Sequence, residues 1–598
     1  MFTDLRSFLE QLRRDGDVVV VEAPVDARLE APEIHRRVIA AGGPAMLFTN
    51  VKGASFPLVT NLFGTPRRAE LAFGRRPQRL IRRIVQLAET LLPPTAGKLW
   101  GARDVLLEAM RIGMKRRGAG PVTEVVTPDV DLSRLPVLTT WEKDGGPFVT
   151  LPLVFTRHPD SGAPNLGMYR LHVHDRRTTG MHWQIGKGGG FHHAVAESRG
   201  EALPVTVFLG GPPALILAAI APLPENVPET MLASLIAGER IATCPGPGAH
   251  DLIANAEFAL VGSVPPRVRR AEGPFGDHYG YYSLRHDYPV FEISHLAHRR
   301  DAIFPATVVG KPRQEDFFIG DLLQELLSPL FPLVMPAVED LWSYGETGYH
   351  ALAGAVVKQR YRREAMASAF RILGEGQLSL TKFLLVVDRK VDLRDFKATL
   401  EHVLARTRPE TDLYVFANVS MDTLDYNTPV VNEGSKGVWL GLGDPVRELP
   451  RDFAAAELPA GLRDPRVFCG GCLVVGGPAY AAEPGAAARF AAHPSLSGWP
   501  LVVVSDTPER AAASPMNFLW TTFTRFNPGS DIHAASKTIH HNHIAYGGPV
   551  VIDARLKPGF PDELFCDAPT AELVGRRWNE YFPSGGVEMG DSARAHLD

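Results

Sequence analysis

Short apolar runs separated by glycine- and proline-rich turns dominate the sequence between about residues 120 and 310. Runs of this length, bounded by such turns, are typical of β-strands rather than helices. The clearest examples lie at 151–156, 205–209, 258–261 and 290–293. The pattern therefore predicts a mainly antiparallel barrel or sandwich in the middle of the chain.

Helical patterns flank this region on both sides. Leu5, Phe8, Leu9 and Leu12 recur at the spacing of one helix face, which predicts an amphipathic helix at the start of the chain. After residue 315, helical patterns alternate with apolar strands such as 382–388. Alternation of this kind indicates an α/β arrangement.

We therefore predict a multidomain protein of mixed α+β and α/β class. The expected domains are an N-terminal α/β domain at 1–120, a central β domain at 121–312 and a C-terminal α/β domain at 313–598. Within the last, the Ala/Gly/Pro-rich stretch 444–512 is interpreted as an inserted subdomain or a mobile surface segment. TRPETD at 407–412 is loosely echoed by TRFNPGSD at 524–531, which leaves open a partial internal duplication.

Composition excludes several classes of partner. The formal net charge is −4 at pH 7, so no overall positive field attracts nucleic acid or anionic lipid. The best apolar run, 214–221, is far shorter than the ~20 residues that span a bilayer, so no transmembrane segment is expected. Only four cysteines occur, too few for a disulfide framework. We expect a cytoplasmic protein with a small-molecule partner.

Polar residues are densest between 165 and 193. His172 and His174 alternate as in a strand and face the same side, where they form either a shared ligand site or, more simply, a hydrogen-bonded wall. Asn165 and Arg170 are five residues apart, which places them on opposite faces of a regular strand. They act in one site only if Gly167 allows a bend or bulge.

Glu272 and Asp277 flank a turn rich in glycine and proline. Such a turn can fold both acids toward one centre, where repulsion raises the pKa of one of them and makes it a general acid. An ordinary hairpin with two solvated acids fits the same residues. Two weaker motifs are Gly-Ser-Lys436, which suits a phosphate but lacks the rest of a P-loop, and Cys469-Gly-Gly-Cys472, a single pair that cannot complete a four-ligand zinc site.

Taken in order, these motifs resemble those of the UbiD family, the 3-octaprenyl-4-hydroxybenzoate carboxy-lyases. The resemblance extends over nearly the whole chain and includes NLFGTPRR, NLGMYR, EGPFGDHYGYYS, FPATVVGKP, TKFLLVVD and DTLDYNTPVVNEGSK. It implies that the central domain is a split β-barrel of the flavin-reductase type. It also implies prenylated FMN supplied by a flavin prenyltransferase, a manganese ion, a potassium ion and a homo-oligomer formed through the C-terminal domain.

The resemblance also implies roles for individual residues. Arg170, Glu272 and Asp277 match the catalytic arginine, its carboxylate partner and the acid. Asn165 and Glu229 match metal-ligand positions, and Lys436 matches the lysine that approaches the cofactor phosphate. The implied cofactor-binding residues are therefore Asn165, Arg170 and Lys436. Oxygen ligands and an ammonium group suit a hard cation that bridges a phosphate.

One position departs from the family pattern. The stretch HWQIGKGG has Gly186 where the family commonly has a histidine metal ligand. His182, His192 or His193 can substitute through a shift of the loop, water can fill the position, or the metal binds weakly. These alternatives predict different degrees of dependence on a metal.

The implied reaction is nonoxidative decarboxylation of a polyprenyl-4-hydroxybenzoate or a naphthoate-type precursor of menaquinone. Arg170 would orient the substrate carboxylate, Glu272 would stay ionised, and Asp277, with its pKa raised by burial and by Glu272, would return the proton. Two other classes of function remain: a noncatalytic scaffold protein of a quinone pathway and an ordinary FMN-dependent oxidoreductase.

Overall fold

The chain forms two compact units in a computed structural model that describes residues 2–74, 76–90, 103, 112–183, 188–223, 227–311, 313–428, 430–454 and 457–592. The first unit contains the described residues up to 326 together with 563–592, and the second contains those from 327 to 562. Each unit is described by itself below.

The first unit begins with the predicted amphipathic helix, α1 (Leu5–Arg14). The Asp4 side chain caps it by accepting a hydrogen bond from the Ser7 backbone N–H, and its four apolar residues are buried. The helix leads into a four-stranded sheet of order β1-β2-β3-β17. Its strands are β1 (Val18–Val21), β2 (Ala45–Phe48), β3 (Leu58–Thr60) and β17 (Phe304–Pro305).

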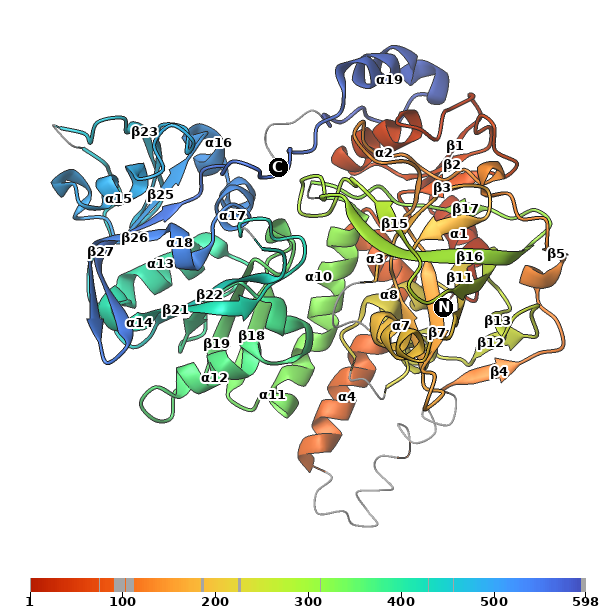
Figure 1. The fold of residues 1–598 in the computed structure, drawn as a ribbon, viewed down its shortest axis with the longest axis horizontal. Helices are drawn as coiled ribbons and strands as arrows, with labels where there is room; N and C mark the ends of the chain where they lie inside the picture. Colours follow the sequence, from red (N-terminus) through yellow and green to blue (C-terminus); the bar gives the residue numbers. More distant parts are fainter. Residues whose placement is uncertain are drawn as a thin grey trace. The chain divides into compact units, whose positions relative to one another are not determined.

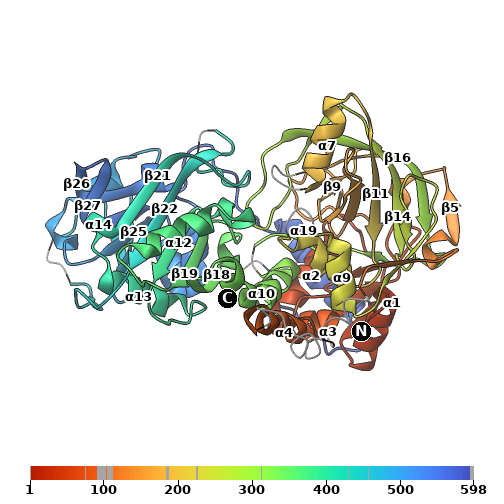
Figure 2. The ribbon, with the colours of Figure 1, turned by 90° about the horizontal axis from the view of Figure 1, so that it is seen from below.

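The predicted antiparallel β domain is present as an eight-stranded sheet. Its main path is β10-β16-β14-β11-β7-β8, and β15 and β5 also pair with β16. Figure 2 shows β11, β14 and β16 side by side. The strands are β5 (Val125–Thr127), β7 (Leu153–Arg157), β8 (Pro164–Gly167), β10 (Thr178–Gly180), β11 (Leu203–Leu209), β14 (Phe258–Val264), β15 (Arg269–Glu272) and β16 (His286–His298).

Smaller elements complete the first unit. They include a three-stranded sheet of order β13-β12-β4 and a strand pair, β6-β9. These strands are β4 (Met114–Arg116), β6 (Phe148–Val149), β9 (Leu171–His172), β12 (Ile241–Cys244) and β13 (Leu252–Ile253). The helices are α2 (Glu30–Ala40), α3 (Pro66–Phe73), α4 (Arg76–Thr90), α7 (Gly188–Ser198), α8 (Ala214–Ile220), α9 (Glu229–Ala237) and α10 (Glu315–Leu327).

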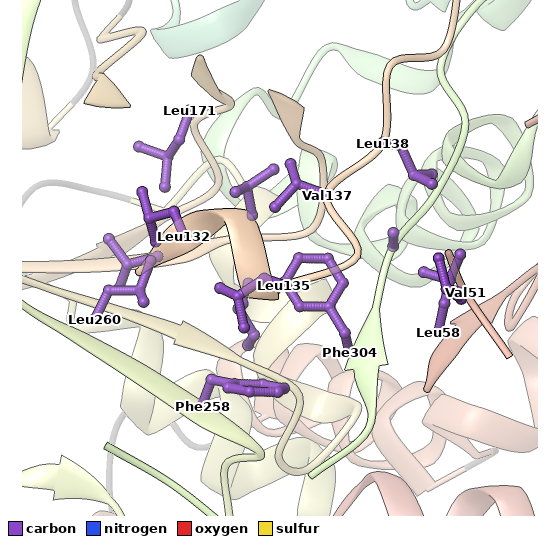
Figure 3. Close-up of a cluster of buried hydrophobic side chains, with 14 of the residues drawn as sticks. Val51, Leu58, Leu132, Leu135, Val137, Leu138, Leu171, Phe258, Leu260 and Phe304 are labelled. Carbon is purple, nitrogen blue, oxygen red and sulfur yellow. The ribbon is translucent and has the colours of Figure 1, made fainter. Parts of the chain in front are cut away.

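One hydrophobic core connects the two main sheets of this unit. Figure 3 shows Leu132, Leu135 and neighbouring side chains of the segment before β6 meeting Phe258 and Leu260 of β14 and Phe304 of β17. Since β17 is part of the N-terminal sheet, the regions 1–120 and 121–312 share a core rather than forming two separate ones.

The C-terminal helix also belongs to the first unit, which corrects the assignment of residues 563–592 to the C-terminal domain. Helix α19 (Ala568–Tyr581) packs against α2, and Val574, Trp578 and Tyr581 are part of the same core (Figure 1). The Tyr581 hydroxyl donates to a carboxylate oxygen of the buried Glu30 at 2.6 Å. The packing of α19 against α2 could not be predicted from local sequence patterns, because the two helices lie far apart in the chain.

The second unit contains two five-stranded sheets (Figure 1). The first has the order β18-β19-β20-β22-β21 and the second the order β23-β24-β25-β27-β26. The strands are β18 (Val338–Ser343), β19 (Leu352–Val357), β20 (Phe383–Val387), β21 (Leu413–Ser420), β22 (Glu433–Gly441), β23 (Arg463–Cys469), β24 (Cys472–Gly476), β25 (Leu501–Ser505), β26 (Ile532–His540) and β27 (His543–Asp553).

The helices of this unit alternate with the strands, as an α/β arrangement requires. They are α11 (Phe331–Val334), α12 (Glu364–Leu373), α13 (Phe396–Arg406), α14 (Pro409–Asp412), α15 (Ala486–Ala491), α16 (Pro508–Ala513), α17 (Pro515–Phe523) and α18 (Pro528–Asp531). The stretch 444–512 supplies β23, β24 and β25 of the second sheet, so it is not a mobile surface segment. Its small residues pack tightly: Ala486, Ala487 and Ala491 are buried beside Phe490.

Among the described residues, one helical run, Glu315–Val334, is long and apolar enough to cross a membrane by length and composition alone. Its first residue, Glu315, is fully buried and accepts hydrogen bonds from the backbone N–H groups of Asn61 and Phe63. The start of the run is therefore packed into the first unit.

Candidate active site

The turn that follows β15 is held by the loop around Trp141. The backbone N–H of Gly276 donates to Asp144 Oδ1 at 2.8 Å, and that of Gly145 donates to the Pro274 carbonyl at 2.7 Å. A Cβ atom on Gly276 would lie 2.0 Å from the Trp141 ring, so no larger residue fits there. These contacts fix the conformation of the segment between Glu272 and Asp277.

Arg170 contacts both acids of this turn. Its Nε donates to Glu272 Oε1 at 3.0 Å, and its Nη1 donates to Asp277 Oδ2. The guanidinium lies over the ring of Phe275, with 4.5 Å between its Cζ atom and the ring centroid. All three charged side chains are largely buried, so the structure brings the three sequence-predicted residues into one desolvated cluster.

Both carboxylates are ionised in this arrangement. Burial alone would raise their pKa values, but His182 and Arg170 lower the pKa of Glu272 to about 2. Arg170 and His278 likewise hold the pKa of Asp277 well below its ordinary value, against the effect of burial. The expectation that Asp277 holds a proton is therefore wrong for this state, because the guanidinium pairs with both acids instead of only with Glu272.

Two histidines extend the cluster. His182 Nδ1 lies 2.7 Å from Glu272 Oε1, and its ring lies against that of Tyr288 with centroids 4.3 Å apart. His278 Nδ1 lies 2.6 Å from Asp277 Oδ1. Burial and the Arg170 charge lower the pKa of His182, so its ring is neutral at pH 7 and donates to the carboxylate.

The wall formed by His172 and His174 lies beside Glu272. His172 and His174 face the same side, with ring centroids 4.8 Å apart, as the alternation predicts. The position of a Cβ atom on Gly180 is 3.1 Å from Glu272 Oε2 and 3.3 Å from His174 Nε2. Burial lowers the pKa of His174 to about 4, so this wall presents neutral imidazoles to the cluster.

Sequence reasoning missed a third carboxyl group, that of Asp316 in the first turn of α10. The segment leading to α10 lies beside the acidic turn, because a Cβ on Gly310 and a Cβ on Gly276 would both contact the Trp141 ring. Burial, together with repulsion from Asp277, raises the pKa of Asp316 to about 6, although His278 opposes this. Asp316 is therefore a carboxyl group whose pKa lies well above the ordinary value and close to neutrality.

We expect Asp316→Asn to stabilise the protein at pH 7.5. The folded-state pKa of about 6 exceeds the ordinary value of 3.8, so the ionised form is penalised above pH 6 and the penalty vanishes below about pH 3.8. The free energy of unfolding should rise by up to ~3 kcal/mol at pH 7.5. Urea unfolding at pH 7.5 and pH 4.0 measures this, with the exposed Asp129→Asn as the control. A gain that is equal at both pH values would contradict the assignment.

Asn165 and Glu229 meet at a second place in the first unit. The bend that joint action of Asn165 and Arg170 would require is present: β8 ends at Gly167, and β9 begins at Leu171 in a different sheet. A Cβ on Gly167 would lie 2.4 Å from the Tyr169 ring, so glycine is required where the chain folds back. Glu229, the first residue of α9, accepts a hydrogen bond from the backbone N–H of Leu166 at 2.9 Å.

These two residues offer oxygen ligands to a cation. Burial raises the pKa of Glu229, so its carboxylate gains from a nearby positive charge. The Asn165 side chain is buried, and its amide oxygen is the atom that a cation would bind. A desolvated carboxylate beside a buried amide is a typical start of a site for a hard divalent cation. No group of three or more His, Cys, Asp or Glu residues suited to a metal is found among the described residues.

Gly186, where the family histidine was expected, lies outside the described residues. Of the three histidines considered as substitutes, His182 contacts Glu272 and His192 Nδ1 lies 2.8 Å from Thr156 Oγ1. His193 lies against Trp183, with ring centroids 4.8 Å apart. His182 is therefore part of the carboxylate cluster, which no local signal in the sequence had indicated.

Lys436 lies in the second unit, on β22. Its Nζ donates to the carbonyls of Ser379 and Thr381 at 2.7 and 2.8 Å. Burial lowers the pKa of Lys436 to about 8, although Asp422 and Asp425 favour its charged form. Cys469 and Cys472 face each other across the β23–β24 hairpin as free, buried thiols, which agrees with a structural role.

Three family models match the sequence in order. They describe the N-terminal, Rift-related and C-terminal domains of 3-octaprenyl-4-hydroxybenzoate carboxy-lyase, and they match residues 9–88, 114–312 and 317–441. The chain belongs to the UbiD family. The C-terminal model ends with β22, so the second sheet of the second unit lies outside the match.

Full-length relatives occur in chlamydiae. A Chlamydia pneumoniae protein, named as one subunit of 4-hydroxybenzoate decarboxylase, is 48% identical over 588 residues, covering 97% of this chain and 98% of the relative. An uncharacterized Chlamydia caviae protein is also 48% identical, over 582 residues, covering 97% of this chain and 99% of the relative. The UbiD chain is thus similar to these relatives along its whole length, including the second sheet.

Two solved UbiD-class enzymes share the fold. The closed form of vanillic acid decarboxylase from Sedimentibacter hydroxybenzoicus has a TM-score of 0.65 and 24% identity, covering 77% of this chain and 97% of that one. HmfF from Pelotomaculum thermopropionicum, in complex with FMN, has a TM-score of 0.61 and 21% identity, covering 76% and 97%. The protein is a carboxy-lyase of mixed α/β multidomain architecture.

Proposed function

We propose that this UbiD protein is a nonoxidative decarboxylase that uses prenylated FMN to remove CO2 from an aromatic or unsaturated acid, with a quinone precursor as its substrate. The observation that carries the proposal is the buried cluster in which Arg170 contacts Glu272 and Asp277. The name of the Chlamydia pneumoniae relative and the FMN and prFMN complexes of HmfF support the reaction and the cofactor. We assign the central β domain as the split barrel that binds the flavin.

The residues of the cluster fit such a cofactor and an acidic substrate. Glu272 Oε2 is buried and has no hydrogen-bond partner among the described residues, so it is available to a bound group. Arg170 has a buried guanidinium that can bind a substrate carboxylate through its planar donors. A prenylated flavin, when bound, supplies the electron sink for the departing CO2.

The chain's own residues orient the acid and return a proton. Arg170 holds the substrate carboxylate, and this contact competes with its hydrogen bond to Asp277. The negative charge of the substrate carboxylate raises the pKa of Asp277. Asp277 then binds a proton and donates it to the product carbon. His278 contacts Asp277, and the charges of both residues influence the pKa of Asp316, so a second carboxyl group that can hold a proton is electrostatically linked to the donor.

Asn165 and Glu229 would hold a manganese ion through their side-chain oxygens. Lys436 is assigned to the flavin phosphate, and a potassium ion is assigned to the same region of the cofactor. The flavin is supplied by a flavin prenyltransferase, and we expect a cytoplasmic homo-oligomer.

Gly188→Ala tests the metal assignment. A Cβ atom on Gly188 would lie 2.1 Å from Asn165 Oδ1, so the substitution must displace the amide. We expect the affinity for Mn²⁺, titrated in the presence of FMN and followed by electron paramagnetic resonance, to fall ~10-fold or more. Gly118→Ala is the matched control, because nothing lies within 4 Å of its added Cβ. Equal Mn²⁺ affinity of the two variants would remove Asn165 from the site.

The proposed function is tested on protein co-expressed with a flavin prenyltransferase. Its bound flavin is identified by absorbance and mass, and CO2 release is measured with hydroxybenzoates and naphthoates. We expect the mass of prenylated FMN and CO2 release from at least one acid. Plain FMN with redox activity would point to an oxidoreductase, and an empty site without CO2 release would point to a scaffold; either result overturns the proposal.

A further inference from the structure

The two sheets of the second unit have the same topology. In the first sheet, β18 and β19 are antiparallel, β19, β20 and β22 are mutually parallel neighbours, and β21 is antiparallel to β22. In the second, β23 and β24 are antiparallel, β24, β25 and β27 are parallel neighbours, and β26 is antiparallel to β27. Strand order along the sheet and along the chain also agree.

Local hydrogen bonds repeat as well. The echoed segments 407–412 and 524–531 form α14 and α18, directly before β21 and β26. In the first, the backbone N–H of Arg408 donates to Asp412 Oδ2 at 2.8 Å; in the second, that of Asn527 donates to Asp531 Oδ2 at 2.7 Å. The second unit therefore contains two copies of one domain, at about 327–454 and 457–562.

The contacts between the two copies are reciprocal. Helix α14 of the first copy lies against β27 of the second, and α18 of the second copy lies against β22 of the first. Because α14 corresponds to α18 and β22 corresponds to β27, each copy presents the same face to the other. This is the isologous contact of a twofold dimer, formed here within one chain.

The copies differ in their polar chemistry. Phe383 lies opposite Gly437 in the first sheet, and the corresponding Leu501 lies opposite Val550 in the second. The residue before Gly437 is Lys436, whereas the residue before Val550 is Pro549. The second copy thus lacks the lysine at this position.

The second copy contacts the strand that carries Lys436. The Ser435 hydroxyl donates to Asn527 Oδ1, and the backbone N–H of Gly529 donates to Ser435 Oγ at 2.6 Å. The Asn427 amide of the preceding loop donates to the Thr524 carbonyl at 2.7 Å. Asn527 and Gly529 lie at the start of α18, so this one turn contacts the residue next to Lys436, whereas Thr524 lies at the end of α17.

We propose that the second copy is a built-in partner domain, and that its Asn527 is a positioning residue for the Ser435–Lys436 segment of β22. The part of this inference that concerns the cofactor rests on the proposed role of Lys436 at the flavin phosphate. The part that concerns the contact between the copies does not.

Hydrogen exchange tests the contact directly. In Asn527→Ala, the amides of Ser435 and Lys436 should exchange ~5- to 10-fold faster, because the side-chain acceptor that joins the copies is lost. Asn527→Asp keeps an acceptor oxygen and should restore slow exchange. Arg408→Ala changes the corresponding, exposed residue of the other copy and is the matched control, with exchange in β22 unchanged.

Binding of FMN separates the two parts of the inference. Lys436→Met and Asn527→Ala should each raise the Kd for FMN by ~5- to 10-fold, and the double variant should bind no more weakly than Lys436→Met alone, because both act through one group. If the two substitutions raise the Kd for FMN additively in the double variant, Asn527 does not act through Lys436. If hydrogen exchange in β22 becomes faster in Asn527→Ala while Lys436→Met binds FMN normally, the contact between the copies is supported. The proposed role of Lys436 at the flavin phosphate is then wrong. If exchange is unchanged in both Asn527→Ala and Ser435→Ala, the inference is wrong.

Discussion

Arg170→Lys is expected to lower decarboxylation by roughly 10³-fold although it keeps the positive charge. The guanidinium uses separate nitrogens for Glu272 and Asp277 and lies over the Phe275 ring. An ammonium group on a flexible stem cannot reproduce this fork, so the two carboxylates lose their common partner. CO2 release from an acid that the wild type decarboxylates measures the effect.

The control for this variant is Arg270→Lys. Arg270 is half-exposed, and its contact with Asp175 Oδ2 at 3.0 Å lies at the surface, where ion pairs contribute little. The turnover of the Arg270→Lys variant should match that of the wild type. Near-normal turnover in Arg170→Lys would show that only the charge matters, and not the geometry of the cluster.

Asp277→Asn is expected to reduce turnover by roughly 10² to 10⁴-fold, because the amide has nearly the same shape but cannot transfer a proton. Cofactor content should be unchanged, since Asp277 contacts Arg170 and His278 within the first unit. Stopped-flow turnover and flavin absorbance on the same preparation separate the two quantities.

Glu272→Gln is the companion variant. Glu272 accepts from Arg170 and lies within hydrogen-bonding distance of His182, so its loss disturbs the position of both. If Asp277→Asn works nearly normally while Glu272→Gln is inactive, the roles of the two acids have been exchanged. A solvent isotope effect present in the wild type and lost in Asp277→Asn would support the assignment as made.

Much of the cluster was predictable because its residues lie in short motifs. NLGMYR and EGPFGDH each carry their functional residues within one turn or bend, so local spacing and resemblance identified Arg170, Glu272 and Asp277. His182 and Asp316 were not assigned to it, since they enter from the segment after β10 and from α10. Only tertiary packing, through Trp141 in the case of α10, brings such segments to the same place.

The charge state of Asp277 was the main error about the site. Two carboxylates near one another raise a pKa only if no cation stands between them, and the sequence did not reveal that Arg170 contacts both. The second sheet was missed for a different reason. Its strands are separated by alanine- and glycine-rich helices and turns, whose composition is similar to that of a surface segment.

The return of α19 to the first unit affects how the protein is made. Residues 563–592 leave the ribosome only after the second unit, yet Val574, Trp578 and Tyr581 complete a core that begins with residues such as Val21. At about 5–20 residues per second, translation of the second unit delays this step by on the order of ten to fifty seconds. During that time the nascent first unit exposes the apolar face of α2 and leaves Glu30 without its tyrosine partner. A stop codon before α19 would leave this part of the first-unit core uncovered in every molecule.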